Sequence, residues 1–504
     1  MLIELADGNS SPHANVINAH KMKKSTWRKH HKWLGLICAF FLIMFALSGL
    51  VLNHPRLFAS VNVSRSLLPA SYRYMQWNRG LLKGTLKWRG KVLIYGNNGI
   101  WITDSTGAGL KDFNRGLPTG ADYRQIKRLC LTPQQQLFAI GQYGLYRLQG
   151  DGIWHEVALQ NDANERLVDM SLQGDSLVVA SRSMLFCAAP PYKQFCPISL
   201  LPPQGYDGRV SLFRLVWLLH SGELFGMVGV LVVDAIAFVL IFLSLTGVVY
   251  FFLPRMRRNK HPKVMRWLLQ WHNHVGRLSI VCTLLLSFTG WLLRPPALIA
   301  IVSSRVHPLP FSTMDSENAW HDKLRSLQYD AAQGDWLLYS SEGFYALKTL
   351  KSTPKPELVQ PPVSVMGINV EEKDAQGRWL IGSFSGMYRW DRAQGYATDY
   401  FDGGPMQPVS GPPIGKNAVA GYSNDFKMGA LVVDYNEGTA RLPMPQWMQT
   451  LPMSLRNVAL EVHTGRIYTF LSLLQVFYIF LIGLSVMWCL WSGWKLRKLS
   501  KTQS

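Results

Sequence analysis

Four stretches of the chain are apolar over the length that a helix needs to cross a lipid bilayer. They cover residues 33–53, 225–253, 275–294 and 469–491. A spanning helix needs about 20 apolar residues, at 1.5 Å of rise each, to cross roughly 30 Å of hydrocarbon. The pattern therefore predicts a bundle of four transmembrane helices. The alternative is four buried helices of a soluble protein.

The apolar stretches belong to a sequence that is written twice. A shift of 241 positions lays His31 on His272, Gly35 on Gly276, Gly49 on Gly290 and Pro55 on Pro296. A shift of 243 lays Ser211 on Ser454 and His220 on His463. Such a self-match indicates a duplicated unit, and the unit here is helix, long loop, helix.

The two long loops, 54–224 and 295–468, alternate short apolar runs with Gly- and Asn-containing turns, which is typical of β-hairpins. Ile100 and Leu145 begin similar runs 45 residues apart, and the runs at Trp336 and Trp379 are 43 apart. Repeats of this length are typical of propeller blades. The loops therefore predict an all-β domain. One propeller of six blades closed from both loops, or two small β domains side by side, both agree with the pattern.

The net charge of +21 comes in large part from segments beside the apolar stretches. Sixteen of the 52 basic residues lie in Lys21–Lys32, Arg255–Arg266 and Lys495–Lys501, and none of these segments contains an acid. This is the positive-inside pattern of a membrane protein, so the charge indicates lipid as the partner and gives no reason to expect nucleic acid. Both termini are then cytoplasmic and both long loops periplasmic, which predicts a multi-pass protein of a bacterial inner membrane.

This topology gives the expected domain layout. It consists of a cytoplasmic tail (1–32), a first span (33–53), a periplasmic β-rich loop (54–224), a second span (225–253), a cytoplasmic basic loop (254–274), a third span (275–294), a second periplasmic β-rich loop (295–468), a fourth span (469–491) and a cytoplasmic tail (492–504). Of the six cysteines, Cys187 and Cys196 lie in the first loop, where an oxidising compartment would allow a disulfide. Their spacing leaves open whether they are bridged.

Four histidines occupy equivalent positions of the duplicated unit. His31 and His272 fall at the cytoplasmic ends of the first and third spans, and His220 and His463 fall just outside the second and fourth. If the halves are related by a two-fold axis along the membrane normal, each pair faces itself across that axis. Two facing imidazoles are the axial ligands of a six-coordinate b-type haem, and no CxxCH motif for covalent attachment is present. Interfacial anchors are the alternative reading.

Further polar residues at the spans are secondary candidates, because ionisable groups are expensive in a membrane. Asp234 lies within the second span and is a candidate proton relay or quinol contact, or else a hydrogen-bond partner of a neighbouring helix. The secondary candidates for haem or interface contacts are His30, His274, His54, Arg277, Arg294 and Arg466; snorkelling explains Arg277 and Arg294 equally well.

The sequence HKWLG at His31, the glycine near the end of the first span, LHSGE at His220 and VHTGR at His463 together resemble the PepSY-associated transmembrane family. Members of that family include inner-membrane siderophore-iron reductases with two b-type haems in a four-helix bundle. The resemblance covers the spans and the residues that lead into them, about a third of the chain. It implies haem ligation by the four histidines and outward electron transfer to ferric iron, but the β-rich loops do not resemble a PepSY unit.

The sequence thus predicts a haem-dependent oxidoreductase that takes electrons from a quinol or another donor and reduces a ferric chelate or siderophore in support of iron uptake. No G-x-G-x-x-G motif occurs in a strand–helix context, so a flavin or nicotinamide domain is not expected. The alternative is a protein without enzymatic activity, anchored in the membrane, whose β domain serves binding, sensing or an uptake system.

Overall fold

The computed structural model describes residues 23–160, 165–256, 262–407, 415, 417–471 and 474–501. The expected tail over 1–32 therefore lies largely outside the described residues. The chain divides into two compact units: Met1–Ile43 with Phe238–Phe288 and Leu481–Ser504, and Met44–Ala237 with Thr289–Phe480. The boundary between the units falls within the four long helices.

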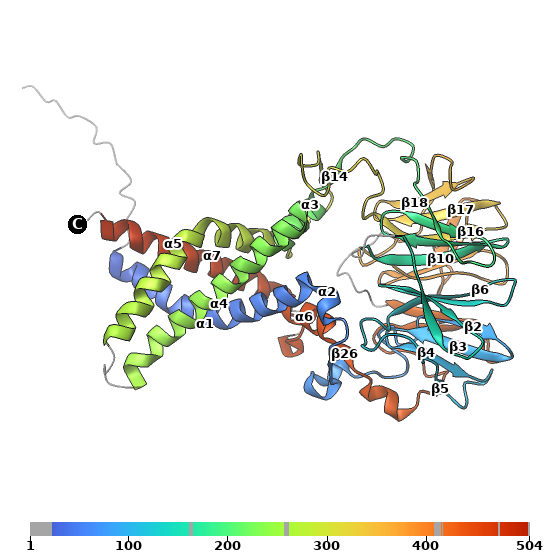
Figure 1. Cartoon of the computed structure of the whole chain (residues 1–504), viewed down its shortest axis with the longest axis horizontal. Helices are drawn as coiled ribbons and strands as arrows, with labels where there is room; N and C mark the ends of the chain where they lie inside the picture. Colours follow the sequence, from blue (N-terminus) through green and yellow to red (C-terminus); the bar gives the residue numbers. More distant parts are fainter. Residues whose placement is uncertain are drawn as a thin grey trace, which may run out of the picture. The chain divides into compact units, whose positions relative to one another are not determined.

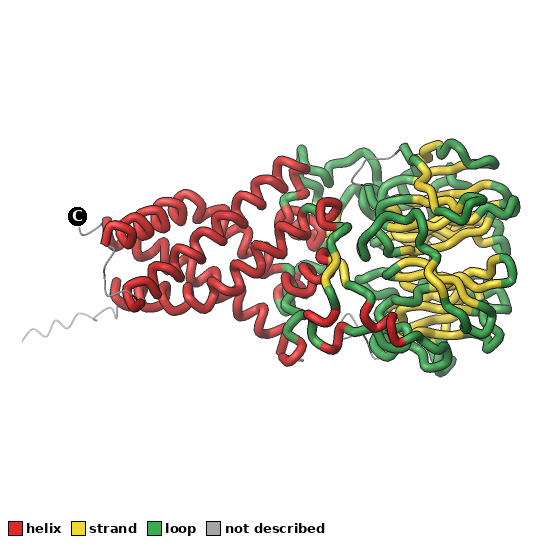
Figure 2. The backbone as a smooth tube through the Cα atoms, turned by 60° about the horizontal axis from the view of Figure 1, so that its bottom comes forward, coloured by secondary structure: helices red, strands yellow, loops and turns green. Residues whose placement is uncertain are grey.

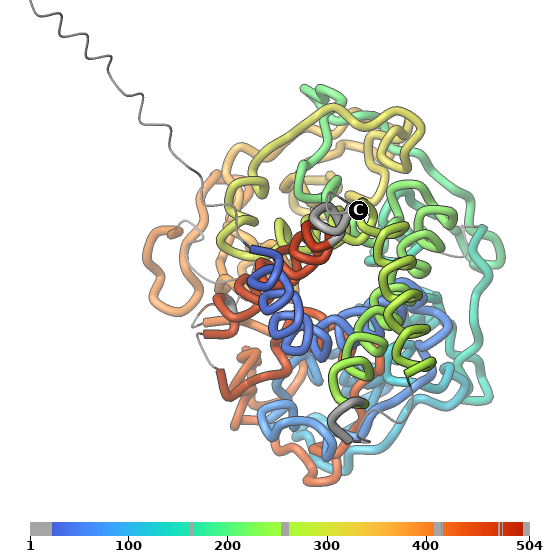
Figure 3. Tube along the Cα trace, turned by 90° about the vertical axis from the view of Figure 1, so that its left-hand side faces the viewer, coloured from blue at the N-terminus to red at the C-terminus, as the bar shows by residue number. Residues whose placement is uncertain are grey.

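Four helices are long and apolar enough to cross a membrane. They are α1 (Lys24–Asn53), α4 (Gly226–Met256), α5 (Pro262–Leu292) and α7 (Leu474–Lys501). Within the first unit, α1 lies beside α7 and α5 beside α4, and the view along the helices shows both neighbours (Figure 3). The protein is therefore a multi-pass membrane protein with a helical membrane region.

The helices extend beyond the apolar stretches read from the sequence. α1 begins at Lys24 rather than near residue 33, and α5 begins at Pro262, within the stretch expected to be a basic loop over 254–274. Charged and aromatic residues end the apolar stretch but do not break a helix, whereas proline is favoured in the first turn. His31 and His272 consequently lie inside helices, about two and three turns after the helix begins.

A separate short helix precedes each of α4 and α7. These helices are α3 (Leu212–Ser221) and α6 (Leu455–His463), and the side chains of Ser211 and Ser454 cap them by accepting from backbone N–H groups. α3 ends at Gly222, which is left-handed with φ 84°, a conformation that favours glycine. His220 and His463 therefore lie at the ends of short helices, and not at the starts of the spanning ones.

The second unit contains a large β-rich domain with six antiparallel sheets (Figures 1 and 2). The first loop forms β2 (Gly84–Trp88), β3 (Lys91–Gly96), β4 (Gly99–Thr103) and β5 (Lys111–Asp112); β6 (Ile126–Leu131), β7 (Leu137–Gly141), β8 (Leu145–Leu148) and β9 (Trp154–Val157); and β10 (Leu167–Gln173), β11 (Ser176–Ser181), β12 (Leu185–Ala188) and β13 (Cys196–Ile198). Each of these three sheets is a meander of four strands.

The second loop forms the other three sheets. They are β16 (Leu324–Asp330), β17 (Asp335–Ser340), β18 (Gly343–Leu347) and β19 (Lys355–Pro356); β20 (Ile368–Lys373), β21 (Trp379–Ser383), β22 (Gly386–Asp391) and β23 (Tyr396–Asp399); and the pair β24 (Val419–Ser423) and β25 (Leu431–Asp434). The hairpins that the repeats predicted are thus present in both loops.

Six hydrophobic clusters join consecutive sheets. Trp154 packs with residues of the first and second sheets, and Trp390 with residues of the fourth and fifth. One cluster, around Trp320 and Trp336, joins the third sheet to the fourth and so joins the two loops. Another, around Trp101 and Leu431, joins the sixth sheet back to the first. Because the loops share these cores, they form one β domain rather than two.

Two short ladders connect the repeats. β1 (Asn62–Val63) pairs with β26 (Met453–Ser454), and β14 (Val210–Ser211) pairs with β15 (Arg305–Val306). β1 is equivalent to β15 and β14 to β26 under the 243 shift, so each strand pairs with a strand of the other repeat. The cap of each short helix, Ser211 or Ser454, is thereby fixed by the opposite half of the chain.

Cys187 and Cys196 are directly opposite one another in β12 and β13. Both are free thiols in this structure.

Candidate functional site: two histidine pairs

The equivalent histidines face each other in two pairs. The ring centroids of His31 on α1 and His272 on α5 are 6.1 Å apart, and those of His220 on α3 and His463 on α6 are 6.0 Å apart. Each pair contains one residue from each repeat. The first pair lies in the first unit and the second pair in the second unit.

A serine or threonine hydroxyl holds Nδ1 of every one of these imidazoles. The four contacts are His31 with Ser492 (3.3 Å), His272 with Thr246 (2.9 Å), His220 with Thr289 (3.2 Å) and His463 with Ser48 (3.0 Å). In all four cases the hydroxyl belongs to a spanning helix of the opposite repeat. The two repeats are therefore connected at each histidine.

The contacts also define which ring nitrogen carries the proton. Nδ1 of His31 is 3.0 Å from the carbonyl of Cys489, and Nδ1 of His463 is 3.1 Å from that of Phe45. A carbonyl oxygen can only accept, so Nδ1 donates in both. The hydroxyl of Thr246 donates to its own helix, to the carbonyl of Phe242 at 2.8 Å, and is free to accept from His272. A proton on Nδ1 leaves Nε2 as the unprotonated nitrogen, the one that is able to ligate a metal.

Burial favours the neutral form of His463 in the second pair. Burial, together with His220 and Arg294 nearby, lowers the pKa of His463 to about 3. Desolvation disfavours the imidazolium, and a second cation would be repelled. A neutral imidazole with Nδ1 protonated is the form that ligates metals.

A glycine follows each of the four hydroxyl residues and lies against the same imidazole. A Cβ added to Gly290 would lie 2.7 Å from Cε1 of His220, and one on Gly493 would lie 3.0 Å from Cε1 of His31. At Gly49 and Gly247 the corresponding distances, to His463 and His272, are 3.5 and 3.7 Å. Each imidazole therefore packs against a Ser-Gly or Thr-Gly pair, which binds Nδ1 and leaves space for the ring.

The sequence analysis missed these Ser-Gly and Thr-Gly dipeptides, although one occurs in each of the four spanning helices. Ser48-Gly49 and Thr289-Gly290 are equivalent under the 241 shift, and Thr246-Gly247 and Ser492-Gly493 under a shift of 246. The repetition of a hydroxyl residue before glycine in every span was the available signal. Only the structure shows that these residues face the histidines.

Asp234 and His54 form a separate pair next to the second histidine pair. His54 Nε2 is 2.7 Å from Asp234 Oδ2, and the Asn53 side chain donates to Asp234 Oδ1 at 3.1 Å. Asp234 is buried. Asn53 follows Gly49, which contacts His463, by one turn of α1, or about 6 Å of axis. The contact joins α4 to the end of α1. It agrees with a proton relay or quinol contact and equally with a hydrogen bond between neighbouring helices.

The other secondary candidates lie outside the pairs. His30 accepts from Trp488 Nε1 at 3.3 Å, His274 packs edge-on against Trp271, and Arg277 is exposed. Arg294 donates to the backbone carbonyl of His463 at 3.3 Å, and burial and Arg466 lower its pKa to about 10.

Arg466 forms an ion pair with Glu461 at 2.7 Å, and Glu461 also accepts from the hydroxyl of Tyr72. Of the three candidate arginines, Arg294 alone touches a residue of a pair in the part of the chain that the structure describes.

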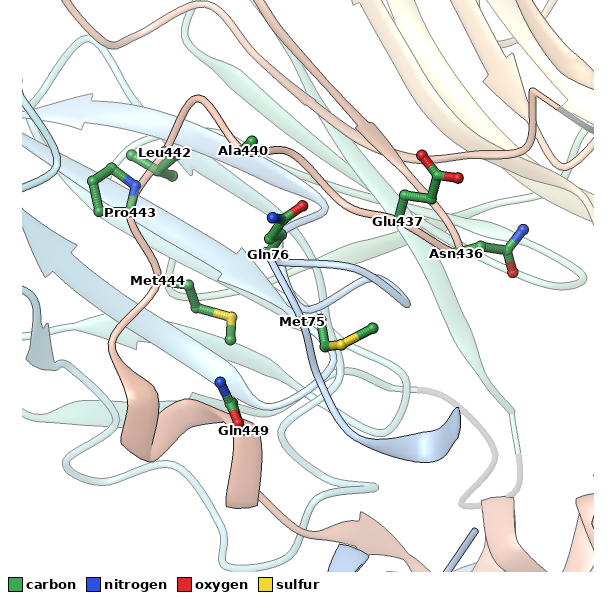
Figure 4. Close-up of a pocket in the computed structure, with 9 residues that line it drawn as sticks. All are labelled: Met75, Gln76, Asn436, Glu437, Ala440, Leu442, Pro443, Met444 and Gln449. Atoms are coloured by element: carbon green, nitrogen blue, oxygen red, sulfur yellow. The ribbon is translucent and has the colours of Figure 1, made fainter. Parts of the chain in front are cut away.

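Two cavities open on the β domain. The larger, of about 680 Å³, is lined by Met75 and Met444 among others, and their side chains extend toward it (Figure 4). Met444 sulfur also accepts from the backbone N–H of Trp77 at 3.3 Å. The smaller, of about 330 Å³, is lined by Arg56 and three tyrosines, Tyr123, Tyr143 and Tyr146.

The chain belongs to the family described as the PepSY-associated TM region. The family matches residues 10–252 and again residues 191–496, and so covers both repeats. This confirms the resemblance read from the histidine motifs. No curated protein sequence matches the chain.

Solved structures resemble it only distantly. The extracellular domain of a two-component-system protein from B. thetaiotaomicron matches 73% of this chain at 10% identity with a TM-score of 0.34. PorZ, a component of the type-IX secretion system of Porphyromonas gingivalis, matches 72% at 10% identity with a TM-score of 0.27. The chain spans 38% of the length of each of these proteins.

Proposed function

We propose that the protein is a membrane oxidoreductase that binds two b-type haems, one at each histidine pair, and passes electrons outward to a ferric chelate. One observation carries the proposal: all four histidines of the duplicated unit are held in the same way, with Nδ1 bound to a hydroxyl and the ring against a glycine of the opposite repeat.

The spacing of the rings fits the proposed group. With metal–imidazole bonds of about 2 Å, two axial imidazoles on one metal ion have centroids roughly 6 Å apart. The observed separations are 6.1 and 6.0 Å. A haem held in this way supplies reversible one-electron chemistry at its iron. Among the described residues no cluster of three or more His, Cys, Asp or Glu side chains could hold a metal ion. Each pair would offer two imidazoles to a haem.

The residues around the pairs prepare the ligands. Donation from Nδ1 to a hydroxyl or carbonyl orients each ring and increases the basicity of Nε2. Burial keeps His463 neutral. Arg294, next to the carbonyl of His463, is placed to pair with an anionic group at the second pair, such as a propionate.

The proposed direction of electron flow follows from the charges and the connections. The basic segments indicate that α1 begins on the cytoplasmic side, which would make the His31–His272 pair the cytoplasmic one and the β domain periplasmic. α3 and α6, which carry the other pair, follow directly from strands β14 and β26. Electrons would enter at the first pair from a quinol or a soluble donor and leave from the second.

We assign Asp234 and His54 the role of a proton acceptor beside the second pair. A carboxylate in a spanning helix is expensive unless it is paired, and here a histidine, itself about a third exposed, is the partner. Such a pair can take up a proton when negative charge arrives nearby.

For the β domain we propose a six-bladed propeller, with one sheet per blade. The support is that six hydrophobic clusters join each sheet to the next and the sixth sheet to the first. Three blades would come from each loop. A propeller closed by blades from both loops would attach α3 and α6 to the same domain.

The alternative, a membrane-anchored binding, sensory or uptake-accessory protein, predicts no chemistry at the pairs. An interfacial anchor has no need for a hydroxyl at Nδ1 and a glycine against the ring at all four positions. The repeated arrangement therefore favours the oxidoreductase.

A reduced-minus-oxidised absorption spectrum with haem quantitation tests the proposal. We expect two b-type haems per chain in the purified protein. His220→Ala and His463→Ala should each remove the same spectral component, and His31→Ala and His272→Ala the other. His30→Ala and His274→Ala are matched controls, because these histidines lie on the same helices outside the pairs, and should retain both. A folded protein without haem, prepared with haem available, would refute the proposal.

A further inference from the structure

A cluster of basic side chains lies where α3 and α6 meet the β domain, all within the second unit. Arg182 and Arg214 both pair with Asp322, the first at 2.9 Å. Arg325 lies beside Arg182 and Arg214. Burial lowers the pKa of Arg325 to about 10, and the positive charges of these two neighbours contribute to the shift. This part of the cluster joins the residues before β16 to helix α3.

The cluster continues toward α6. Burial lowers the pKa of Arg166, and Arg456 and Arg182 nearby lower it further. Burial also lowers the pKa of Lys127, which lies close to Lys83, Arg182 and Arg166. We call the set of seven the basic cluster; its members are Lys83, Lys127, Arg166, Arg182, Arg214, Arg325 and Arg456.

The acids nearby do not neutralise the basic cluster. Asp322 serves two arginines, and Asp122 lies 3.7 Å from Arg456. Asp169 lies near Lys127 and Glu223 near Arg166, and Asp169 already pairs with Arg128, so four carboxylates face seven cations. In the described part of the chain, Lys83 and Arg166 form no ion pair, and Lys127 donates only to the backbone carbonyl of Leu167.

Burying a cation without a counterion costs free energy, because the cation loses its hydration and no opposite charge compensates for the loss. Burial accordingly lowers the pKa of Lys83 to about 8. Nε of Arg214 and of Arg456 are also buried without a partner. Several donors and unbalanced positive charges at one place are what an anionic ligand would satisfy.

The basic cluster is close to the second histidine pair. Arg214 precedes His220 by six residues on α3, and Arg456 precedes His463 by seven on α6. At 1.5 Å per residue these are about 9 and 10.5 Å of helix axis. Each of the two helices thus carries an arginine of the cluster near one end and a histidine of the pair at the other.

A cavity adjoins the basic cluster. Tyr143 lines the cavity of about 330 Å³ and donates to Asp122 at 2.6 Å, and Asp122 is the carboxylate beside Arg456. Arg56 lies over the ring of Tyr143, 5.7 Å from its centroid. A ligand can therefore approach the cluster from a surface lined by three tyrosines and Arg56, with one carboxylate, Glu156, at its edge.

We propose that the basic cluster binds the ferric chelate as an anion, so that the protein selects negatively charged chelates, with carboxylate or catecholate donors, over neutral and cationic ones. This rests on the proposed function. In the reaction one electron passes from the reduced protein to Fe(III), which becomes Fe(II); the electron is replaced by the quinol or other donor. No covalent bond of the protein forms or breaks.

Binding can be measured apart from electron transfer with gallium citrate, an anionic complex whose metal is not reduced. The haem-loaded, detergent-purified protein is titrated calorimetrically with gallium citrate and with the cationic gallium complex of a trihydroxamate. We expect at least tenfold tighter binding of the anionic complex, weakening as salt is added. Equal binding of both, or binding of neither, would overturn the inference, and this comparison needs no variant.

Single substitutions then locate the site. Lys83→Gln and Arg166→Gln should each weaken gallium citrate binding about tenfold. Lys87→Gln is the matched control, because Lys87 is an exposed lysine four residues after Lys83, and should bind like wild type. Tight binding that survives both substitutions in folded protein would place the anion elsewhere and overturn the inference.

Oxidation of the reduced protein by ferric citrate separates this inference from the proposed function. Binding that depends on Lys83 and Arg166 without any oxidation would retain the anion site and refute the reductase. Oxidation that is unaffected by the substitutions would retain the reductase and refute the role of the basic cluster.

Discussion

Gly290→Ala tests directly whether the second histidine pair depends on the glycine beside it. The added Cβ would lie 2.7 Å from Cε1 of His220, whereas ordinary carbon contacts begin at about 3.4 Å. The ring must therefore move by about 0.7 Å. Its freedom to do so is small, because the hydroxyl of Thr289, on the same helix, holds Nδ1. Metal–ligand distances tolerate changes of only about 0.2 Å.

Two other glycines supply matched controls. A Cβ on Gly247 would lie 3.7 Å from His272, and one on Gly49 would lie 3.5 Å from His463; both are ordinary contacts. All three glycines lie within helices, where alanine is favoured over glycine by about 1 kcal/mol. A general loss of helix stability therefore cannot explain a defect confined to Gly290→Ala.

Haem quantitation and the absorption spectrum of the purified variants give the result. We expect Gly290→Ala to retain about one haem per chain, or to keep two with the second no longer six-coordinate, while Gly247→Ala and Gly49→Ala keep two with unchanged spectra. If Gly290→Ala keeps two haems with the wild-type spectrum, the imidazole of His220 is not an axial ligand in the position described. Equal losses in all three variants would refute the argument from the individual distances.

Four further predictions follow from contacts described above or from buried charges in the β domain. Thr246→Val removes the acceptor of one Nδ1 proton and should weaken haem retention at the first pair about 10- to 100-fold, measured by haem loss to a scavenger protein. Cys187 and Cys196, opposite one another across an antiparallel ladder, should resist alkylation in protein taken from an oxidising compartment until a reductant is added. Burial and Asp169 raise the pKa of Glu371 to about 8, so the native state holds its proton more tightly than the unfolded chain; the melting temperature should fall from pH 6 to pH 8, and less so in Glu371→Gln. Arg392 is buried among three carboxylates between the fourth and fifth sheets. Its replacement by methionine should lower the free energy of unfolding by about 3–5 kcal/mol, measured as a lower melting temperature of the β domain.

The sequence was most informative where physical constraints act over many residues. The four spans follow from length and apolarity, and the family follows from the repeated histidine motifs. The β domain follows from hairpin repeats in both loops. Helix ends were less predictable. α5 begins as early as Pro262, because Trp267, His272 and their polar neighbours are compatible with a helix that projects out of an apolar layer.

Contacts between distant segments were beyond the sequence. His54 has no equivalent in the second repeat, yet it pairs with Asp234, 180 residues away. The repeat comparison favours residues that match between the halves, so it gave His54 only a secondary place and did not indicate Asp234 as its partner. The basic cluster is similar, because its members come from the beginnings of the first strands of four sheets, from the turn after β11, and from α3 and α6.

The arrangement of the hydroxyls explains why the duplication matters. His31 of the first repeat is held by Ser492 of the second, and His463 of the second by Ser48 of the first. The other two histidines are held across the repeats in the same way. Each pair thus takes one imidazole and one hydroxyl from each half of the chain. Neither half alone contains a complete pair, so the two repeats must fold together before either pair can bind a ligand.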